Sequence, residues 1–215
     1  MAEFVLAKPM AGRRFSLLLG TLVLLLMAAP LFGQTTRAET ELATLFSLVV
    51  IGFVVASTRH RLVAGAFALL WLGLTWSGHG AGIAADLALL ALCLVTIDSV
   101  LAHALSARQV DQEVIAAAIS AYILMGIAWA VVFSLLEASS PGAFHLATEE
   151  ASEPWSALLY FSFATLTTLG YGDVAPLSMT ARAWATVEAM GGTLYLAILI
   201  ARLVSLYRTG QENAS

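Results

Sequence analysis

Charged residues are scarce in this sequence. Only 11% of its 215 residues are Asp, Glu, Lys or Arg, whereas about a quarter of an average globular protein is charged. Hydrophobic residues make up 60% of the chain. This composition excludes an ordinary soluble domain. Because a membrane-spanning helix takes about 20 residues, the apolar residues suffice for roughly six spans, and we expect the chain to work inside a lipid bilayer.

Three further absences narrow the function. The net charge is −4 without a basic patch, so nucleic-acid binding is excluded. Cys93 is the single cysteine, so it cannot form an intrachain disulfide, and in its apolar run we interpret it as a buried packing residue. No nucleophile–base spacing, metal-ligand motif or paired half-sequence is present. We therefore expect no enzymatic activity and no cofactor.

Six apolar runs are near or above the length that crosses hydrocarbon. The third is the shortest, and a re-entrant segment stays open for it. The runs cover residues 15–32, 42–57, 62–76, 83–105, 114–136 and 181–207.

Positive charge gathers on one side of a six-span threading. With the N-terminus inside, only Arg37 and Arg182 lie outside, in keeping with the preference of Lys and Arg for the cytoplasmic side. We expect a multi-pass protein of the plasma or bacterial inner membrane with both termini in the cytoplasm. The first run follows two arginines, as in a signal peptide, but its length and poor cleavage site favour an uncleaved anchor. The inner cations are Lys8, Arg13, Arg14, Arg59, Arg61, Arg108, Arg202 and Arg208.

The longest gap between runs contains a short apolar segment. It opens at Glu153-Pro154-Trp155 and reaches Thr167. Its length of about 12 residues corresponds to about 18 Å at 1.5 Å per residue, too short to span. Pro154 suits a first helical position. We therefore expect a re-entrant helix that crosses half the membrane.

Non-helical backbone must follow this helix at membrane depth, in the run Thr168-Leu169-Gly170-Tyr171-Gly172-Asp173. Such backbone is tolerated only where protein buries it or where it lines a water-filled path. Two glycines separated by one residue permit angles that bring successive carbonyls to one side, and carbonyls in this arrangement replace the hydration shell of a cation. An extracellular Gly-Tyr-Gly turn is the alternative for the isolated motif. After a half-membrane helix, the sequence favours the cation site.

The segment from Thr165 to Asp173, with Pro176, Arg182 and Gly192 after it, resembles the pore signature of tetrameric potassium channels. The resemblance to this family, with its helix, pore loop and helix unit, covers residues 114–207. It implies an all-α membrane fold of six transmembrane helices with a re-entrant pore helix and a selectivity-filter loop. Because one chain supplies one filter loop, it also implies a homotetramer around a central pore.

The resemblance implies roles for individual residues. Gly172 and Asp173 would form the outer mouth, and Gly191 with Gly192 would lie at the gating hinge of the last helix. The backbone carbonyls of Thr168, Leu169, Gly170 and Tyr171, with the Thr168 hydroxyl, would coordinate K⁺.

The sequence departs from this family at two positions. Leu169 stands where valine is usual, which leaves its carbonyl unaffected but puts the rigidity of the filter in question. Ala164 stands where some members carry a carboxylate behind the filter. Asp173 then needs another partner, for which Tyr160 is the candidate.

The acidic residues within the spans leave alternatives open. Glu188, in the last run, either steadies the filter by a hydrogen bond to the pore helix, with its protonation modulating gating, or is a buried acid satisfied by Ser or Thr. Asp86 and Asp98 are either functional acids or hydrogen-bond partners of neighbouring helices. Asp98 and His103, five residues apart, are poorly matched for direct contact.

The fourth run, 83–105, contains no Lys or Arg, whereas a voltage sensor needs several. We therefore reject a conventional voltage sensor and divide the chain into a four-span packing bundle, 1–109, and a pore domain, 110–215. The predicted function is passive, potassium-selective conduction in a lipid bilayer. The gating stimulus, including control by a separate regulatory subunit, stays open. The alternatives are a weakly selective cation channel and a proton-coupled transporter built on Asp86, Asp98, His79 and His103.

Overall fold

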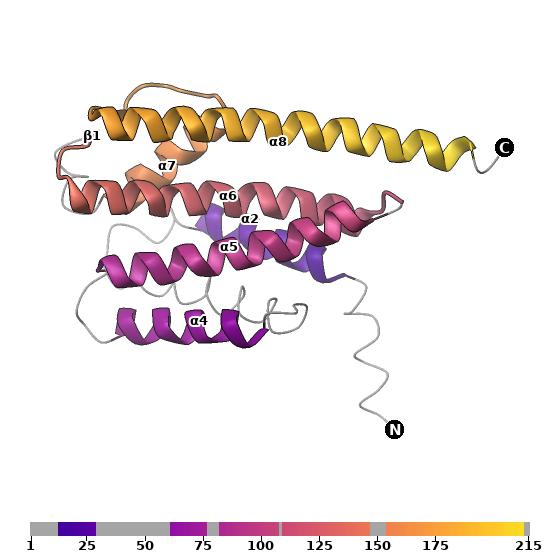
Figure 1. The fold of residues 1–215 in the computed structure, drawn as a ribbon, viewed down its shortest axis with the longest axis horizontal. Helices are drawn as coiled ribbons and strands as arrows, with labels where there is room; N and C mark the ends of the chain where they lie inside the picture. The colour runs from indigo at the N-terminus through magenta and orange to yellow at the C-terminus, as the bar shows by residue number, and fades with distance from the viewer. Residues whose placement is uncertain (1–12, 29–60, 77–81, 108, 147–153, 213–215) are drawn as a thin grey trace.

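The computed structural model describes residues 13–28, 61–76, 82–107, 109–146 and 154–212, and within these ranges the chain is almost entirely helical (Figure 1). A two-stranded pairing of β1 and β2 is the exception. The elements are α2 (Arg14–Ala28), α4 (Arg61–Trp76), α5 (Ile83–Ser106), α6 (Gln112–Ser139), β1 (Phe144–His145), α7 (Trp155–Leu166), β2 (Ala175–Pro176) and α8 (Met179–Glu212).

Three of the described helices are long and apolar enough to cross a membrane: Ile83–Ser106, Gln112–Ser139 and Met179–Ser205. Arg14–Met27 and Trp155–Leu166 are shorter apolar helices. The described part of the chain is mostly helical and has three candidate spans, which is consistent with the expected all-α membrane protein. The third predicted run forms the helix α4, whereas the second, 42–57, lies outside the described residues.

The long helices lie side by side in alternating directions (Figure 1). α2, α4 and α6 run one way, and α5 and α8 run the opposite way. The short helix α7 lies between α6 and α8. α6 is central, since 72% of its membrane-crossing window is buried, compared with 11% for α8.

Acidic side chains cap the N-terminal ends of α2 and α6. Asp111 caps α6 by accepting a 2.8 Å hydrogen bond from the Val114 amide. In the first turn of α6, the Glu113 carboxylate accepts a 2.9 Å bond from the Phe15 amide and further bonds from Ser16. Helix N-terminal amides lack intrahelical partners, so Glu113 satisfies the start of α2 and ties it to α6.

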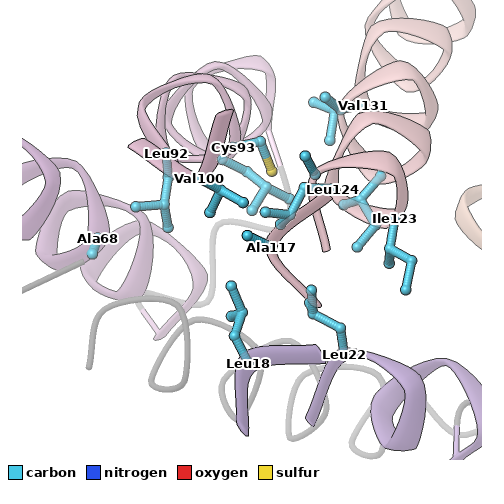
Figure 2. Packing of buried hydrophobic residues seen from close by; sticks show 14 of the residues in the cluster. Leu18, Leu22, Ala68, Leu92, Cys93, Val100, Ala117, Ile123, Leu124 and Val131 are labelled. Carbon is cyan, nitrogen blue, oxygen red and sulfur yellow. The ribbon is translucent and has the colours of Figure 1, made fainter. Parts of the chain in front are cut away.

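The main core lies where α6 meets α2 and α5. Figure 2 shows Cys93 and Val100 of α5 on the side of Leu124 of α6, with Leu18 and Leu22 of α2 below, whereas Leu92 of α5 lies beside Ala68 of α4. Small side chains on α6 permit close approach of the neighbouring helices, as is common in membrane bundles. These side chains are Ala116, Ala117, Ala121 and Ala128.

A second core cluster positions α7. The rings of Phe133 on α6, Phe144 on β1 and Phe161 on α7 contact one another edge to face, with centroid separations of 5.1–5.4 Å. β1 pairs antiparallel with β2, with Phe144 opposite Pro176 and His145 opposite Ala175. The loop before α7 is thereby joined to the segment before α8.

Candidate functional site

The candidate site begins with α7, whose 12 residues form the short apolar helix expected from the sequence. Pro154 is the N-cap and the helix starts at Trp155, so the expectation that Pro154 occupies the first helical position is wrong by one residue. The Pro154 carbonyl accepts the Leu158 amide at 2.9 Å. Helix geometry ends at Leu166, because the next residues turn back onto the last turn.

The backbone after α7 directs its N–H groups toward the helix end. The amides of Leu169 and Gly170 both donate to the Ala164 carbonyl, at 2.8 and 3.1 Å, and the Thr168 amide donates to Thr165 at 3.0 Å. Among the described residues, no N–H or O–H group donates to the carbonyl oxygens of residues 168–171. These four oxygens are therefore available to a ligand outside the single chain.

Backbone handedness alternates along the same segment. Thr168, Gly170 and Gly172 have φ values of 59°, 52° and 81°, whereas Leu169 and Tyr171 have negative φ. In such an alternation, successive N–H groups turn to one side of the chain, so the carbonyls turn to the other. Glycine adopts positive φ freely, but for a β-branched threonine it is a strained conformation that costs about 1–3 kcal/mol. Strain of this kind is concentrated at functional sites.

Hydrogen bonds secure the far end of this segment. The Tyr160 hydroxyl of α7 donates to Asp173 Oδ1 at 3.0 Å, which is the pairing that the sequence analysis expects. Arg182 Nε donates to the Pro176 carbonyl at 3.1 Å. A cavity of about 190 Å³ lies between α7 and the loop, beside the short side chain of Ala164.

Behind α7, Glu188 of α8 is fully buried and lies against the helix. Ser162 Oγ is 2.5 Å from Glu188 Oε1 and 2.7 Å from the Gly126 carbonyl oxygen on α6. This contact agrees with both interpretations of Glu188 from the sequence. Glu188 is a buried acid satisfied by a serine, and that serine belongs to the short helix α7.

Gly192 lies one helical turn after Glu188, against the end of α7. A Cβ atom at Gly192 would lie 2.7 Å from the Leu166 carbonyl oxygen, whereas one at Gly191 would meet nothing within 4 Å. The same carbonyl accepts a 2.9 Å hydrogen bond from Tyr122. α8 runs as one helix through both glycines. The structure thus gives Gly192 a close-packing position, and the gating hinge stays a prediction.

These contacts form a line that we call the rear seam. Each of the three helices contributes two residues spaced four apart, which places them on one helix face. Tyr122, Gly126 and Ser162 were not among the predicted site residues. The signal in the sequence for Tyr122 and Gly126 is a polar residue and a glycine at four-residue spacing within an apolar helix, whereas Ser162 has no such partner on α7. The rear seam consists of Tyr122 and Gly126 on α6, Ser162 and Leu166 on α7, and Glu188 and Gly192 on α8.

The remaining acids do not join a second site. Asp86 accepts a 3.0 Å hydrogen bond from Ser134 of the neighbouring helix α6. Asp98 is exposed, and the described residues show no hydrogen bond or ion pair between it and His103, whose ring stacks on Phe15. His79 lies outside the described residues. Within the described ranges, no group of three His, Cys, Asp or Glu side chains could hold a metal ion.

Comparison with known proteins points to the same region. Residues 121–209 match the ion channel family, a segment that takes in most of α6, all of α7 and the loop, and nearly all of α8. Two-pore potassium channel 4 of Arabidopsis thaliana is 40% identical over 55 residues, which cover 26% of this chain and 19% of the plant protein. No solved structure matches the chain. This part of the protein is thus similar to ion channels.

Proposed function

We propose that the protein is a potassium-selective channel subunit that conducts K⁺ passively through a pore formed by four chains. The observation that carries this proposal is the segment after α7, where residues 168–171 keep carbonyl oxygens without a donor among the described residues. A short apolar helix precedes this segment, and the matched ion channel family includes it. Conduction involves no chemical step, so the protein is not an enzyme.

The filter chemistry follows from the backbone. A cation that enters the pore loses water ligands, and carbonyl oxygens at fixed spacing replace them. The C-terminal end of α7 points its partial negative charge toward the same place. Gly172 and Asp173 form the outer mouth, with Tyr160 and Glu188 supporting the filter. The K⁺ ligands are the carbonyls of Thr168, Leu169, Gly170 and Tyr171, and the Thr168 hydroxyl.

The tetramer is supported by the surface of α8. This helix has apolar side chains that stay exposed in the single chain, with Val187, Met190, Leu194 and Ile198 each at least 49% exposed. The filter residue Tyr171 is 72% exposed. A single chain offers a cation one set of carbonyls, so closure around the ion needs further copies related by rotation. Three more copies of this chain complete the pore and cover α8.

The proposed topology has six spans with both termini in the cytoplasm. α2 and α4 run in the same direction, as the first and third spans of such a threading do (Figure 1). Arg14 begins α2 at the end of the bundle where Arg202 of α8 donates to the Leu105 and Ala107 carbonyls that end α5. This shared end has the cations that favour the cytoplasmic side of the plasma or bacterial inner membrane.

Residues 1–109 form the bundle that packs around the pore domain, 110–215. α5 carries no Lys or Arg, so the fourth span lacks the charges that a conventional voltage sensor moves. The stimulus therefore acts elsewhere, at the filter, at the inner helices or through a separate regulatory subunit.

Reversal potentials test the proposal. The full chain is reconstituted in planar bilayers with K⁺ on one side and Na⁺ on the other. A reversal potential close to the K⁺ equilibrium value supports the proposed function. Equal permeability of the two ions supports a weakly selective cation channel instead, in which Leu169 loosens the filter. A flux coupled to a proton gradient would favour the transporter.

A further inference from the structure

Within the rear seam, the group formed by Ser162, the Gly126 carbonyl and Glu188 has more hydrogen-bond acceptors than hydrogens. Ser162 Oγ lies within hydrogen-bond distance of both the Gly126 carbonyl oxygen and Glu188 Oε1, at 2.7 and 2.5 Å. A serine hydroxyl carries one hydrogen and can donate it once. If Glu188 were a carboxylate, one of these two acceptors would face the oxygen of Ser162 without a hydrogen between them. One further proton satisfies both contacts.

The surroundings of Glu188 do not stabilise a negative charge. Its side chain is 0% exposed and Oε2 has no partner. Among the described residues no Lys, Arg or His forms an ion pair with it. Of the elements packed against it, α6 presents Tyr122 as the titratable group that interacts with it, and α7 presents Ser162 and no charged residue. A buried carboxylate without a cation is strongly disfavoured, whereas a neutral acid leaves only a carbonyl oxygen unpaired.

We propose that Glu188 is a protonated positioning residue, which donates its hydrogen to Ser162 while Ser162 donates to the Gly126 carbonyl. This relay of two hydrogen bonds joins α8 to α7 and α7 to α6. When Glu188 loses its proton to a base in solution, Ser162 turns its single hydrogen to the carboxylate, and the Gly126 carbonyl loses the hydrogen bond from α7. The hydrogen bond that joins α7 to α6 at Ser162 is then broken.

The consequence for conduction rests on the proposed function. Ser162 lies two residues before Ala164, whose carbonyl holds the amides of Leu169 and Gly170. A shift of α7 at Ser162 therefore moves the backbone that carries the filter carbonyls. The proton on Glu188 thus controls the geometry of the filter from its rear side, without contact with the permeant ion.

Infrared spectroscopy tests the protonation independently of conduction. The wild-type protein, reconstituted in lipid at neutral pH, should show the C=O stretching band of a protonated carboxylic acid, and Glu188→Gln should remove it. Asp86→Asn is the matched control, because Asp86 also accepts a serine hydroxyl within a span, and it should leave the Glu188 band in place. A wild-type spectrum at neutral pH in which no acid band disappears with Glu188→Gln would overturn the assignment.

Current recordings test the positioning role. Glu188→Gln keeps a hydrogen donor at this site, so it should retain K⁺ selectivity and lose any decline of current at alkaline pH. Glu188→Ala and Ser162→Ala should both lose selectivity. Unchanged selectivity in both, or the same alkaline decline in Glu188→Gln as in the wild type, would overturn the role. If the wild type shows the acid band but carries no K⁺ current, the proposed function fails while the protonation of Glu188 stands.

Discussion

Gly192 of α8 and Leu166 of α7 approach so closely that a single added methyl group at the glycine would lie 2.7 Å from the leucine carbonyl oxygen. The obstacle is backbone, which cannot move aside as a flexible side chain can. The carbonyl is also held by Tyr122 from the opposite helix. The last residue of α7 is therefore held between α6 and α8, two residues before the segment with free carbonyls begins.

Gly192→Ala should destabilise the protein and impair conduction. Overpacking of this kind costs about 1–3 kcal/mol, since α8 must shift away from α7. The measurement is thermal unfolding of the purified protein in detergent, combined with open probability in bilayers. Gly191→Ala is the matched control, because nothing lies within 4 Å of its added methyl group. A larger effect of Gly191→Ala would favour the hinge over close packing.

Gly170→Ala should abolish K⁺ flux while leaving oligomer assembly intact. Gly170 has a φ of 52°, and a side chain in this conformation costs about 1–2 kcal/mol, so the filter backbone should leave its geometry. Tracer flux into proteoliposomes measures the loss, and size-exclusion chromatography measures assembly. Gly20→Ala is the control, because Gly20 lies in α2 with open space around it. Preserved flux in Gly170→Ala would count heavily against the filter.

The pairing of Tyr160 with Asp173 should show a measurable coupling. Tyr160→Phe removes the hydroxyl that donates to Asp173 Oδ1, and Asp173→Ala removes the oxygen that accepts this hydrogen bond. A double-mutant cycle on thermal unfolding should give a coupling free energy of about 0.5–1.5 kcal/mol, as expected for one hydrogen bond. Additive effects of the two substitutions would show that the contact contributes nothing to stability.

Glu113→Ala should destabilise the protein by about 1–2 kcal/mol, the scale of a lost helix cap. The substitution leaves the amides of Phe15 and Ser16 without their acceptor. The measurement is the unfolding temperature in detergent. Gln112→Ala, at the exposed neighbouring position, is the control and should stay close to the wild type. Equal unfolding temperatures for the two variants would contradict the capping role.

Single-channel open probability should depend little on membrane potential. Steep voltage dependence requires several charges that move through the field, and α5 has no Lys or Arg. Recordings over a range of positive and negative voltages, at constant pH and tension, check this expectation. A steep change in open probability would locate gating charge outside α5.

The predictability of the structure from its sequence differs between regions. Apolar runs locate the helices because a membrane span must be apolar along its length, which hydropathy shows directly. The predicted run is extended by one residue in α5 and by two to five residues at each end in α6 and α8. The apolar segment before the glycine-rich loop is too short to span a membrane, and this length predicts the short helix α7. The outer contact of Tyr160 with Asp173 followed from the resemblance to potassium channels, because some of them carry a carboxylate at the position of Ala164 and its absence here left Asp173 in need of another partner.

The sequence by itself determined that the protein lies in a membrane, that a short helix precedes a glycine-rich loop, and that no arginine occupies the fourth run. Each of these properties is local, and composition and spacing along the chain express it directly. Only the tertiary structure decided which residues meet behind α7, since Ser162 lies 36 residues from Gly126 and 26 from Glu188, and Leu166 lies 44 from Tyr122. Such contacts depend on how helices rotate and pack against one another, and side-chain shape in three dimensions sets that rotation.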